Sequence, residues 1–273
     1  MRIGGSTRLL AVLGDPVAHS LSPAMHNAAI DVLGLDAVYV ALRTTAATIP
    51  DILTTLTSLG IAGNVTVPLK GAVERCVARK TDLCARTGSC NTFWVEQGVL
   101  VGDNTDVPAI AAELQDMGVV GGRWLLLGTG GSARAVAIAA SHAGAELLVQ
   151  SRDPARANAF AEWATGQGAR AKRAHGSDSA EVIVNATPLG LRDNDPLPTG
   201  GAPHRGLTAA LDLVYRPGSS RWVRDLSRHG VGARDGRGVL VRQGALAWRR
   251  FFPEESPPIE VMHAAVERAL RAS

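Results

Sequence analysis

Five short polar strings in the chain combine residue types that could line a polar cleft and transfer a proton. In chain order they are Gly14–Pro23, Asn64–Lys70, Gly88–Thr92, Gly102–Asp106 and Val241–Ala245. Lys70 could donate a proton or stabilise an oxyanion, and Asp106 could orient that lysine and hydrogen-bond a substrate hydroxyl. Taken singly, each string also fits a turn, a surface charge or a helix cap, as Ser22 before Pro23 does. The argument therefore depends on their order and spacing.

A glycine-rich turn in the second half of the chain has the pattern of a dinucleotide-binding turn. The apolar run Trp124–Leu127 leads into Gly128-Thr129-Gly130-Gly131-Ser132, and a helix is expected from about Ser132 to His142. Gly128 permits a tight turn, Gly130 lets the backbone approach a pyrophosphate, and the amides at the helix start bind its charge. This context favours nucleotide binding over a plain glycine-rich loop.

The strand expected at Glu146–Gln150 is followed by residues that distinguish NADP from NAD. Arg152 and Arg156 could pair with the 2′-phosphate of NADP. Asp153 could instead bind the ribose of NAD, or it could cap the helix that Pro154 opens. The sequence favours NADP, and because of Asp153 it leaves NAD or dual use open.

Apolar, strand-like stretches alternate with helix-like ones, which predicts βαβ units on parallel sheets. In the first half they are Leu9–Leu13, Pro23–Leu33, Ala37–Leu42, Ile49–Leu59, Ile61–Val65 and Pro68–Ala78. Asn91–Val95 and Leu100–Val101 flank a Glu96-Gln97-Gly98 turn, and we expect this hairpin at the edge of the first sheet. Further on we expect a helix at Pro154–Ala164, strands at Val182–Val184 and Ala210–Val214, a loop at Arg192–Arg205, and helices over Val239–Phe252 and Ile259–Leu270.

The alternation predicts an α/β chain of two domains. A discontinuous N-terminal α/β substrate domain is expected over residues 1–105, closed by the C-terminal helices of residues 241–273. A Rossmann-like dinucleotide-binding domain is expected over residues 106–240.

Composition excludes several other classes of protein. The 273 residues are 46% hydrophobic and 19% charged, which fits ordinary globular domains, and a net charge of +3 is too small to indicate nucleic-acid binding. Cys76, Cys84 and Cys90 form no CxxC pair, which suits a reducing compartment. No apolar run is long enough for a membrane span, and no HExxH or Cys/His cluster indicates a metal. We expect a cytoplasmic monomer or homodimer.

Taken together and in this order, the strings resemble the shikimate dehydrogenase family of the aromatic amino-acid pathway over essentially the whole chain. The family's paired serines match Ser20 and Ser22, and its NVTxPxK string matches Asn64–Lys70. The remaining matches are Asn91 in its VNT-like motif, Asp106 in its NTD motif, Gln243 in its C-terminal motif, Gly128–Ala135 in its GxGGxxxA turn, and the NATPLG and DLVY strings at Asn185–Gly190 and Asp212–Tyr215.

The resemblance implies reversible reduction of 3-dehydroshikimate to shikimate with NADPH. Lys70 and Asp106 would be the catalytic pair, and which of them donates the proton is open. The implied substrate-binding residues are Ser20, Ser22, Asn64, Thr66, Asn91, Tyr215 and Gln243. The implied cofactor-binding residues are Gly128, Gly130, Gly131, Ser132, Ser151, Arg152, Arg156, Thr187, Leu213 and Gly236.

The chain departs from the family pattern at two places, and the first of them keeps the choice of cofactor open. Members that use NADP commonly carry Asn-Arg-Thr where Ser151-Arg152-Asp153 stands, and Val107 replaces a glycine that usually follows the NTD aspartate. An NAD-linked quinate, shikimate or amino-shikimate dehydrogenase is therefore one alternative, although Ser22 favours shikimate. A non-catalytic ligand sensor on the same fold is another, and the retention of Lys70 and Asp106 argues against it.

Overall fold

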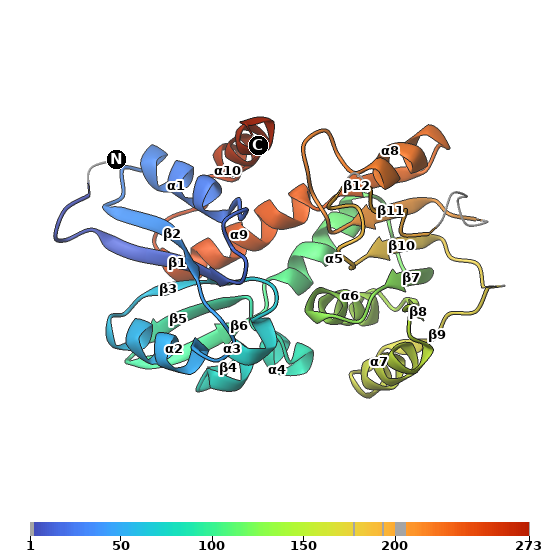
Figure 1. Ribbon diagram of the computed structural model, residues 1–273, viewed down its shortest axis with the longest axis horizontal. Coiled ribbons are helices and arrows are strands. Elements are labelled where there is room, and N and C mark those ends of the chain that lie inside the picture. The colour runs from blue at the N-terminus through green and yellow to red at the C-terminus, as the bar shows by residue number, and fades with distance from the viewer. Residues whose placement is uncertain (1–2, 177, 193, 200–205, 273) are drawn as a thin grey trace. The chain divides into compact units, whose positions relative to one another are not determined.

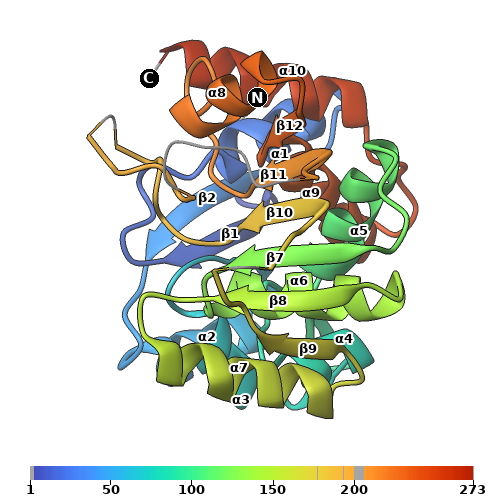
Figure 2. The same cartoon turned by 90° about the vertical axis from the view of Figure 1, so that its right-hand side faces the viewer.

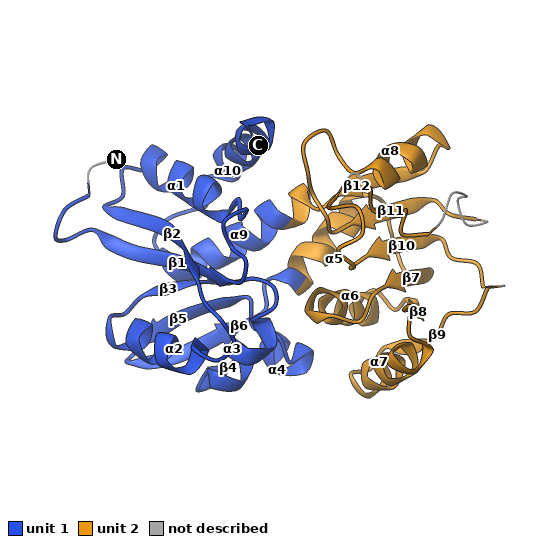
Figure 3. Cartoon of the chain, viewed as in Figure 1, with its two compact units in different colours: residues 1–106, 240–273 blue, residues 107–239 orange. Residues whose placement is uncertain are grey.

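The chain forms two compact α/β units in a computed structural model that describes residues 3–176, 178–192, 194–199 and 206–272. Unit 1 comprises residues 1–106 and 240–273, and unit 2 comprises residues 107–239 (Figure 3). Each unit contains one six-stranded sheet flanked by helices (Figure 1). The predicted α/β class is therefore confirmed.

The sheet of unit 1 has the strand order β2-β1-β3-β5-β6-β4. Its strands are β1 (Arg8–Gly14), β2 (Ala37–Arg43), β3 (Ala62–Val65), β4 (Arg79–Lys80), β5 (Thr92–Glu96) and β6 (Val99–Asp103). Strands β1, β2 and β3 are parallel, and β5 runs antiparallel to both β3 and β6. The polar ends of several strands consequently meet at one edge of this sheet.

The hairpin of β5 and β6 forms as predicted, but its predicted place at the sheet edge is wrong. Gln97 and Gly98 close the turn with φ angles of 52° and 76°, which suit a two-residue hairpin loop. Strand β4 pairs with β6 and takes the edge position instead. With only two residues, β4 is too short to produce a pattern that the sequence could reveal.

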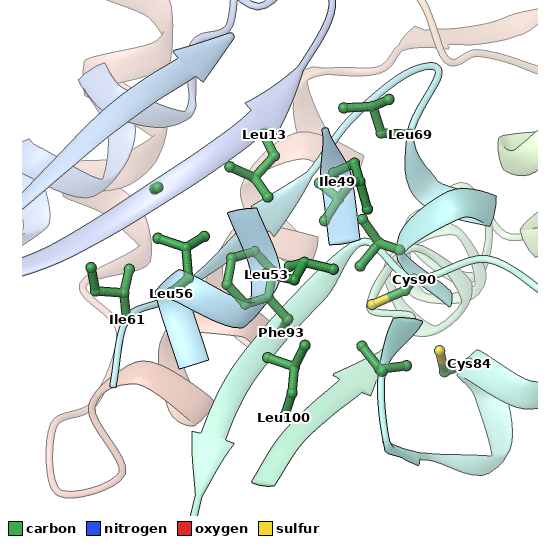
Figure 4. Packing of buried hydrophobic residues seen from close by; sticks show 14 residues of the cluster. Leu13, Ile49, Leu53, Leu56, Ile61, Leu69, Cys84, Cys90, Phe93 and Leu100 are labelled. Carbon is green, nitrogen blue, oxygen red and sulfur yellow. The ribbon is translucent and has the colours of Figure 1, made fainter. Parts of the chain in front are cut away.

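Helices cover the sheet of unit 1 and enclose its core. They are α1 (Ser22–Val32), α2 (Ile49–Ser58), α3 (Lys70–Cys76), α4 (Asp82–Thr87), α10 (Ile259–Ala272) and most of α9 (Arg237–Phe251). In one core cluster, Phe93 of β5 lies between Leu53 of α2 and Leu100 of β6 (Figure 4). Helices α2 and α3 both contribute residues to this core cluster. Their packing therefore holds α3 against the sheet, beside the strand ends where α3 begins.

The sheet of unit 2 is fully parallel, with the order β12-β11-β10-β7-β8-β9. Its strands are β7 (Arg123–Leu127), β8 (Glu146–Gln150), β9 (Arg170–Arg173), β10 (Val182–Asn185), β11 (Ala209–Asp212) and β12 (Gly232–Asp235), seen one above the other in Figure 2. The accompanying helices are α5 (Asp106–Asp116), α6 (Gly131–His142), α7 (Pro154–Gly166) and α8 (Arg221–Arg228). This is the doubly wound Rossmann order, whose direction reverses between β7 and β10.

The loop expected at Arg192–Arg205 is only partly visible. Residue 192 and residues 194–199 lie in bends, turns and irregular backbone, and residues 193 and 200–205 lie outside the described residues. No helix in the described part of the chain is long and apolar enough to cross a membrane.

Candidate active site

The polar strings of unit 1 gather because their strands end at the same edge of the sheet. Asn64 at the end of β3 is in register with Thr92, the first residue of the antiparallel β5. Thr92 is in turn paired with Asp103, the last residue of β6. The segments that follow β3 and β6 and the segment that precedes β5 are therefore neighbours.

Lys70 and Asp106 form a direct ion pair at this edge. Each is the first residue of a helix, Lys70 of α3 and Asp106 of α5. The Lys70 Nζ lies 2.6 Å from Asp106 Oδ2, and the two side chains are only 13% and 11% exposed. An ammonium group has three hydrogens, so two remain for other acceptors.

Asn91 holds the second oxygen of Asp106. Its Nδ2 donates to Asp106 Oδ1 at 2.8 Å, and its Oδ1 accepts from the backbone N–H of Thr105 at 2.8 Å. A backbone N–H can only donate, so the orientation of the Asn91 amide is determined. Gln243 of α9 also reaches this amide, with its Oε1 3.4 Å from Asn91 Nδ2. The structure thus brings together four residues that were predicted from separate strings.

Asn64 joins the same network from β3. Its Nδ2 donates to the carbonyl oxygen of Asn91 at 3.2 Å and to Thr92 Oγ1 at 3.0 Å. Its Oδ1 accepts from the hydroxyl of Tyr39 at 2.8 Å, and burial raises the pKa of that tyrosine. Tyr39 was not predicted, because an aromatic residue in β2 has the signature of an ordinary core position.

Asn104 positions the backbone of Asp106. Its Oδ1 accepts from the Asp106 N–H at 3.1 Å, and its Nδ2 donates to the carbonyl of Ser89 at 2.8 Å. Asn104 therefore links the start of α5 to the segment that precedes Asn91. It lies within one of the quoted strings but was not predicted as a site residue.

The three remaining polar residues of unit 1 follow β1 and β3. Helix α1 begins at Ser22 with Leu21 at the cap position, so the structural alternative for Ser22, a helix cap, does not hold. The hydroxyl of Ser20 instead accepts from the Ser22 N–H at 3.3 Å. Thr66 is half-buried, and its methyl group fills the space that a side chain on Gly14 would need. None of the three hydrogen-bonds to Lys70 or Asp106.

Tyr215 belongs to unit 2, where it follows β11. Burial raises the pKa of its hydroxyl group.

The glycine-rich turn of unit 2 fits a dinucleotide pyrophosphate. Gly128 has φ +105°, and a Cβ atom there would lie 3.0 Å from the carbonyl oxygen of Ala186. Gly130 occupies the cap position of α6, where no described side chain caps the helix and a Cβ would meet open space. Gly131 and Ser132 begin the helix. Their backbone amides and the positive end of the helix dipole are suited to binding phosphate.

The segment after β8 supplies cations for an additional phosphate. Asp153 caps α7, because its side chain accepts from the Ala155 N–H at 2.9 Å, which is the structural alternative that the sequence offered. Arg152 and Arg156 are exposed, and neither pairs with another described side chain. Ser151 lies beside them at the end of β8 and accepts from the Asp153 N–H at 3.4 Å.

The last predicted cofactor residues follow β10, β11 and β12. Thr187 donates from its hydroxyl to Asn185 Oδ1 at 2.6 Å, and the Leu213 N–H donates to the Asn185 carbonyl at 2.9 Å. A Cβ on Gly236 would lie 2.4 Å from the carbonyl oxygen of Leu213, so only glycine permits this close approach. The three residues are thus tied together at one end of the sheet.

Unit 2 has the Rossmann strand order and a glycine-rich turn suited to phosphate, with no cap from a described side chain on the helix that follows. Unit 1 is a second α/β unit and carries a lysine–aspartate pair. These features define a two-domain α/β dehydrogenase that uses a nicotinamide dinucleotide. The family model for the shikimate dehydrogenase substrate binding domain matches residues 12–93. This chain belongs to the shikimate dehydrogenase family and is an oxidoreductase of that family.

Individual relatives carry this assignment over nearly the whole chain. Shikimate dehydrogenase (NADP(+)) of Thermus thermophilus is 40% identical over 95% of this chain and 98% of its own. The enzyme of the same name from Rubrobacter xylanophilus is 39% identical over 97% of each chain. The crystal structure of shikimate 5-dehydrogenase from Thermus thermophilus in complex with NADP(H) and shikimate aligns with a TM-score of 0.85, at 38% identity, over 97% of this chain and 100% of that one.

Proposed function

We propose that the chain catalyses the reversible NADPH-dependent reduction of 3-dehydroshikimate to shikimate in aromatic amino-acid biosynthesis. In this proposal unit 1 binds the substrate and unit 2 binds NADP. The observation that carries the proposal is the ion pair of Lys70 and Asp106, with Nζ and Oδ2 2.6 Å apart in a nearly buried hydrogen-bond network. Relatives named shikimate dehydrogenase (NADP(+)) support the choice of substrate.

Lys70 supplies the proton and the positive charge that ketone reduction needs. NADPH, when bound, provides a hydride to the carbonyl carbon. Negative charge then develops on the carbonyl oxygen, and the Lys70 ammonium stabilises that charge and transfers a proton from Nζ. Asp106 accepts one Lys70 hydrogen and so directs the other two. In the oxidative direction Lys70 takes the proton back from the hydroxyl.

The other residues of unit 1 recognise the substrate's polar groups. Asn64, Asn91 and Gln243 serve the ring hydroxyls, and Ser20 and Ser22 serve the carboxylate. Thr66 completes the proposed set of unit 1. Because a substrate that lacks one of these groups loses a hydrogen bond inside the site, the proposal predicts weaker binding of deoxy analogues.

In unit 2 the amides at the start of α6 would hold the pyrophosphate of NADP. The guanidinium groups of Arg152 and Arg156 would hold its 2′-phosphate, since both are exposed and close in sequence after β8. Asp153 is engaged as a helix cap, which leaves the two arginines to decide the cofactor preference.

Substitution of Lys70 by methionine tests the proposal. The expected result is a fall in kcat of about 100-fold or more with little change in the KM for shikimate. Lys80 provides a matched control, because its Nζ also lies 2.6 Å from a carboxylate, that of Glu74, in the same unit. Lys80→Met should keep wild-type kcat. A Lys70→Met enzyme with normal kcat and only a raised KM would contradict the assignment.

We also propose that the protein works in the cytoplasm, as a monomer or a homodimer. Cys76, Cys84 and Cys90 are all free thiols, which suits a reducing compartment. Sedimentation equilibrium distinguishes the two oligomeric states, and a larger assembly would contradict both.

A further inference from the structure

Three parallel strands of unit 2 end in a buried row of polar residues that the proposed mechanism does not use. Asn185 ends β10, Asp212 ends β11 and Asp235 ends β12, and the register pairs each with the next. Their exposed fractions are 0%, 0% and 7%. Burying a carboxylate is costly unless its surroundings compensate the charge, so the two aspartates require a physical explanation.

Asp212 differs from Asp235 in having only neutral partners. Its Oδ2 accepts from the Ser220 hydroxyl at 2.6 Å, and its Oδ1 accepts from Asn185 Nδ2 at 2.8 Å and from the Val214 N–H at 3.1 Å. Asp235 instead accepts from Arg237 Nε at 2.8 Å. The negative charge of Asp212 therefore has no cation beside it among the described residues.

The titration of Asp212 agrees with this geometry. Burial raises the pKa of the Asp212 carboxyl to about 6, although the donors Ser220, Asn185 and Val214 act in the opposite direction. The neighbouring charge of Asp235 raises the pKa further. The Asp212 group is thus mostly ionised at neutral pH and loses its charge in mildly acidic solution.

Asp212 ends a strand in the half of the sheet where the nicotinamide of the proposed cofactor would lie. In a doubly wound sheet the dinucleotide lies across the carboxyl ends of the strands, with one half on each side of the point where strand order reverses. The phosphate turn follows β7 and Arg152 follows β8, so the adenosine half belongs to that side. The nicotinamide half consequently belongs to β10, β11 and β12, of which β11 is central.

We propose that Asp212 is an electrostatic positioning residue that makes unit 2 favour the oxidised cofactor over the reduced one. The nicotinamide ring of NADP⁺ carries a positive charge, and the ring of NADPH is neutral. An uncompensated carboxylate in a buried row attracts the charged ring and has no equivalent attraction for the neutral one. The inference rests on the proposed NADP site and concerns its selectivity between redox states.

Calorimetric binding of NADP⁺ and of NADPH to the full chain, each without substrate, tests the inference. Asp212→Asn removes the charge and keeps the shape of the side chain. We expect this variant to lower the ratio of the NADPH Kd to the NADP⁺ Kd by about fivefold. This is the size of effect expected when the attraction between one carboxylate charge and the charged nicotinamide ring is lost. Ser219→Ala removes a hydrogen bond to the neighbouring Asp235 and leaves the partners of Asp212 in place, so it should leave the ratio unchanged.

An equal change of both Kd values in Asp212→Asn would overturn the proposal, because a purely structural role affects both cofactor forms alike. A wild-type chain that binds neither form would instead refute the proposed function itself. The two failures are therefore distinguishable.

A second measurement keeps the proposal testable if Asp212→Asn does not fold. The wild-type chain is titrated rapidly with NADP⁺ and with NADPH at pH 7.5 and at pH 5.5, and binding is followed by tryptophan fluorescence. The ratio of the NADPH Kd to the NADP⁺ Kd should be lower at pH 5.5, where Asp212 is mostly protonated. The 2′-phosphate titrates in both cofactor forms and cancels in the ratio. The charged group in register with Asp212 is Asp235, which is itself paired with Arg237. A ratio that is the same at both pH values would contradict the proposal.

Discussion

Replacing His26 by phenylalanine should remove a pH dependence of folding that the wild-type protein carries. His26 lies in α1, is 0% exposed, and neither ring nitrogen has a hydrogen-bond partner among the described residues. Its ring stacks on Tyr39, with centroids 4.4 Å apart and planes 16° apart. Burial lowers the pKa of His26 from 6.5 to about 3. A phenyl ring keeps the stacking and does not titrate.

The size of the effect follows from linkage between proton binding and folding. Below pH 6.5 the unfolded chain binds a proton at His26 that the native chain does not bind, so stability falls as pH falls. Between pH 7.5 and pH 5.0 the wild-type protein should lose about 2 kcal/mol of unfolding free energy from the pKa shift at His26 alone. The loss grows until the pH approaches the native pKa.

Urea unfolding of both proteins at several pH values measures this loss. The difference between the two unfolding free energies cancels the contributions of all other titrating groups, and any packing change from the larger ring adds the same amount at each pH. The stability of His26→Phe relative to the wild type should rise by about 2 kcal/mol from pH 7.5 to pH 5.0. His263→Phe, at an exposed position on α10, is the control and should follow the wild-type curve. Parallel curves for His26→Phe would refute the reasoning.

Three further substitutions test the turn chemistry, the cofactor contacts and the packing. Asp153→Ala removes the cap of α7 and should lower the unfolding free energy by about 1 kcal/mol without weakening NADP binding, and weaker binding would show a direct cofactor role. Arg152→Gln should raise the Kd for NADP by about tenfold and leave that for NAD unchanged, whereas an equal effect on both would exclude a 2′-phosphate contact. In Gly63→Ala the new Cβ would lie 2.0 Å from the Ala11 carbonyl oxygen, so the unfolding free energy measured by thermal unfolding should fall by about 3 kcal/mol. Gly166→Ala is the control, because nothing lies within 4 Å of a Cβ there, and it should show no such loss. A small loss at Gly63 would mean that the sheet adjusts locally.

In unit 2 the sequence predicts the inner strands of the sheet and misses the two edge strands, whereas in unit 1 it predicts the edge strand β2. Strands β7 and β8 are continuous apolar runs in the middle of a parallel sheet, and both are predicted. Strands β9 and β12 have the sequences RAKR and GARD and form the two edges of the same sheet. Edge strands tolerate charged residues, so neither produces an apolar pattern. Helix α8, with the sequence RWVRDLSR, is obscured by its charges in the same way.

The candidate site is predictable to the extent that its residues form local strings. Lys70, Asn91 and Asp106 each follow or precede a strand and carry a chemistry that a reader of the sequence can recognise. Tyr39 contributes through a hydrogen bond to Asn64 across an intervening strand, and no local pattern signals such a contact. Asp212 lies within a quoted string, but its electrostatic role depends on which strands neighbour β11. Contacts of this kind are properties of the sheet order and have no signature along the chain.

Steady-state oxidation of shikimate and of quinate, each with NADP and with NAD, tests the central claim most directly. The account predicts turnover with shikimate and NADP that clearly exceeds the other three combinations, because the site offers hydroxyl and carboxylate partners and Arg152 and Arg156 are available for a 2′-phosphate. Preference for quinate or for NAD would contradict the proposed substrate or cofactor contacts, and absence of turnover in all four combinations would contradict the assignment of Lys70 and Asp106 as a catalytic pair.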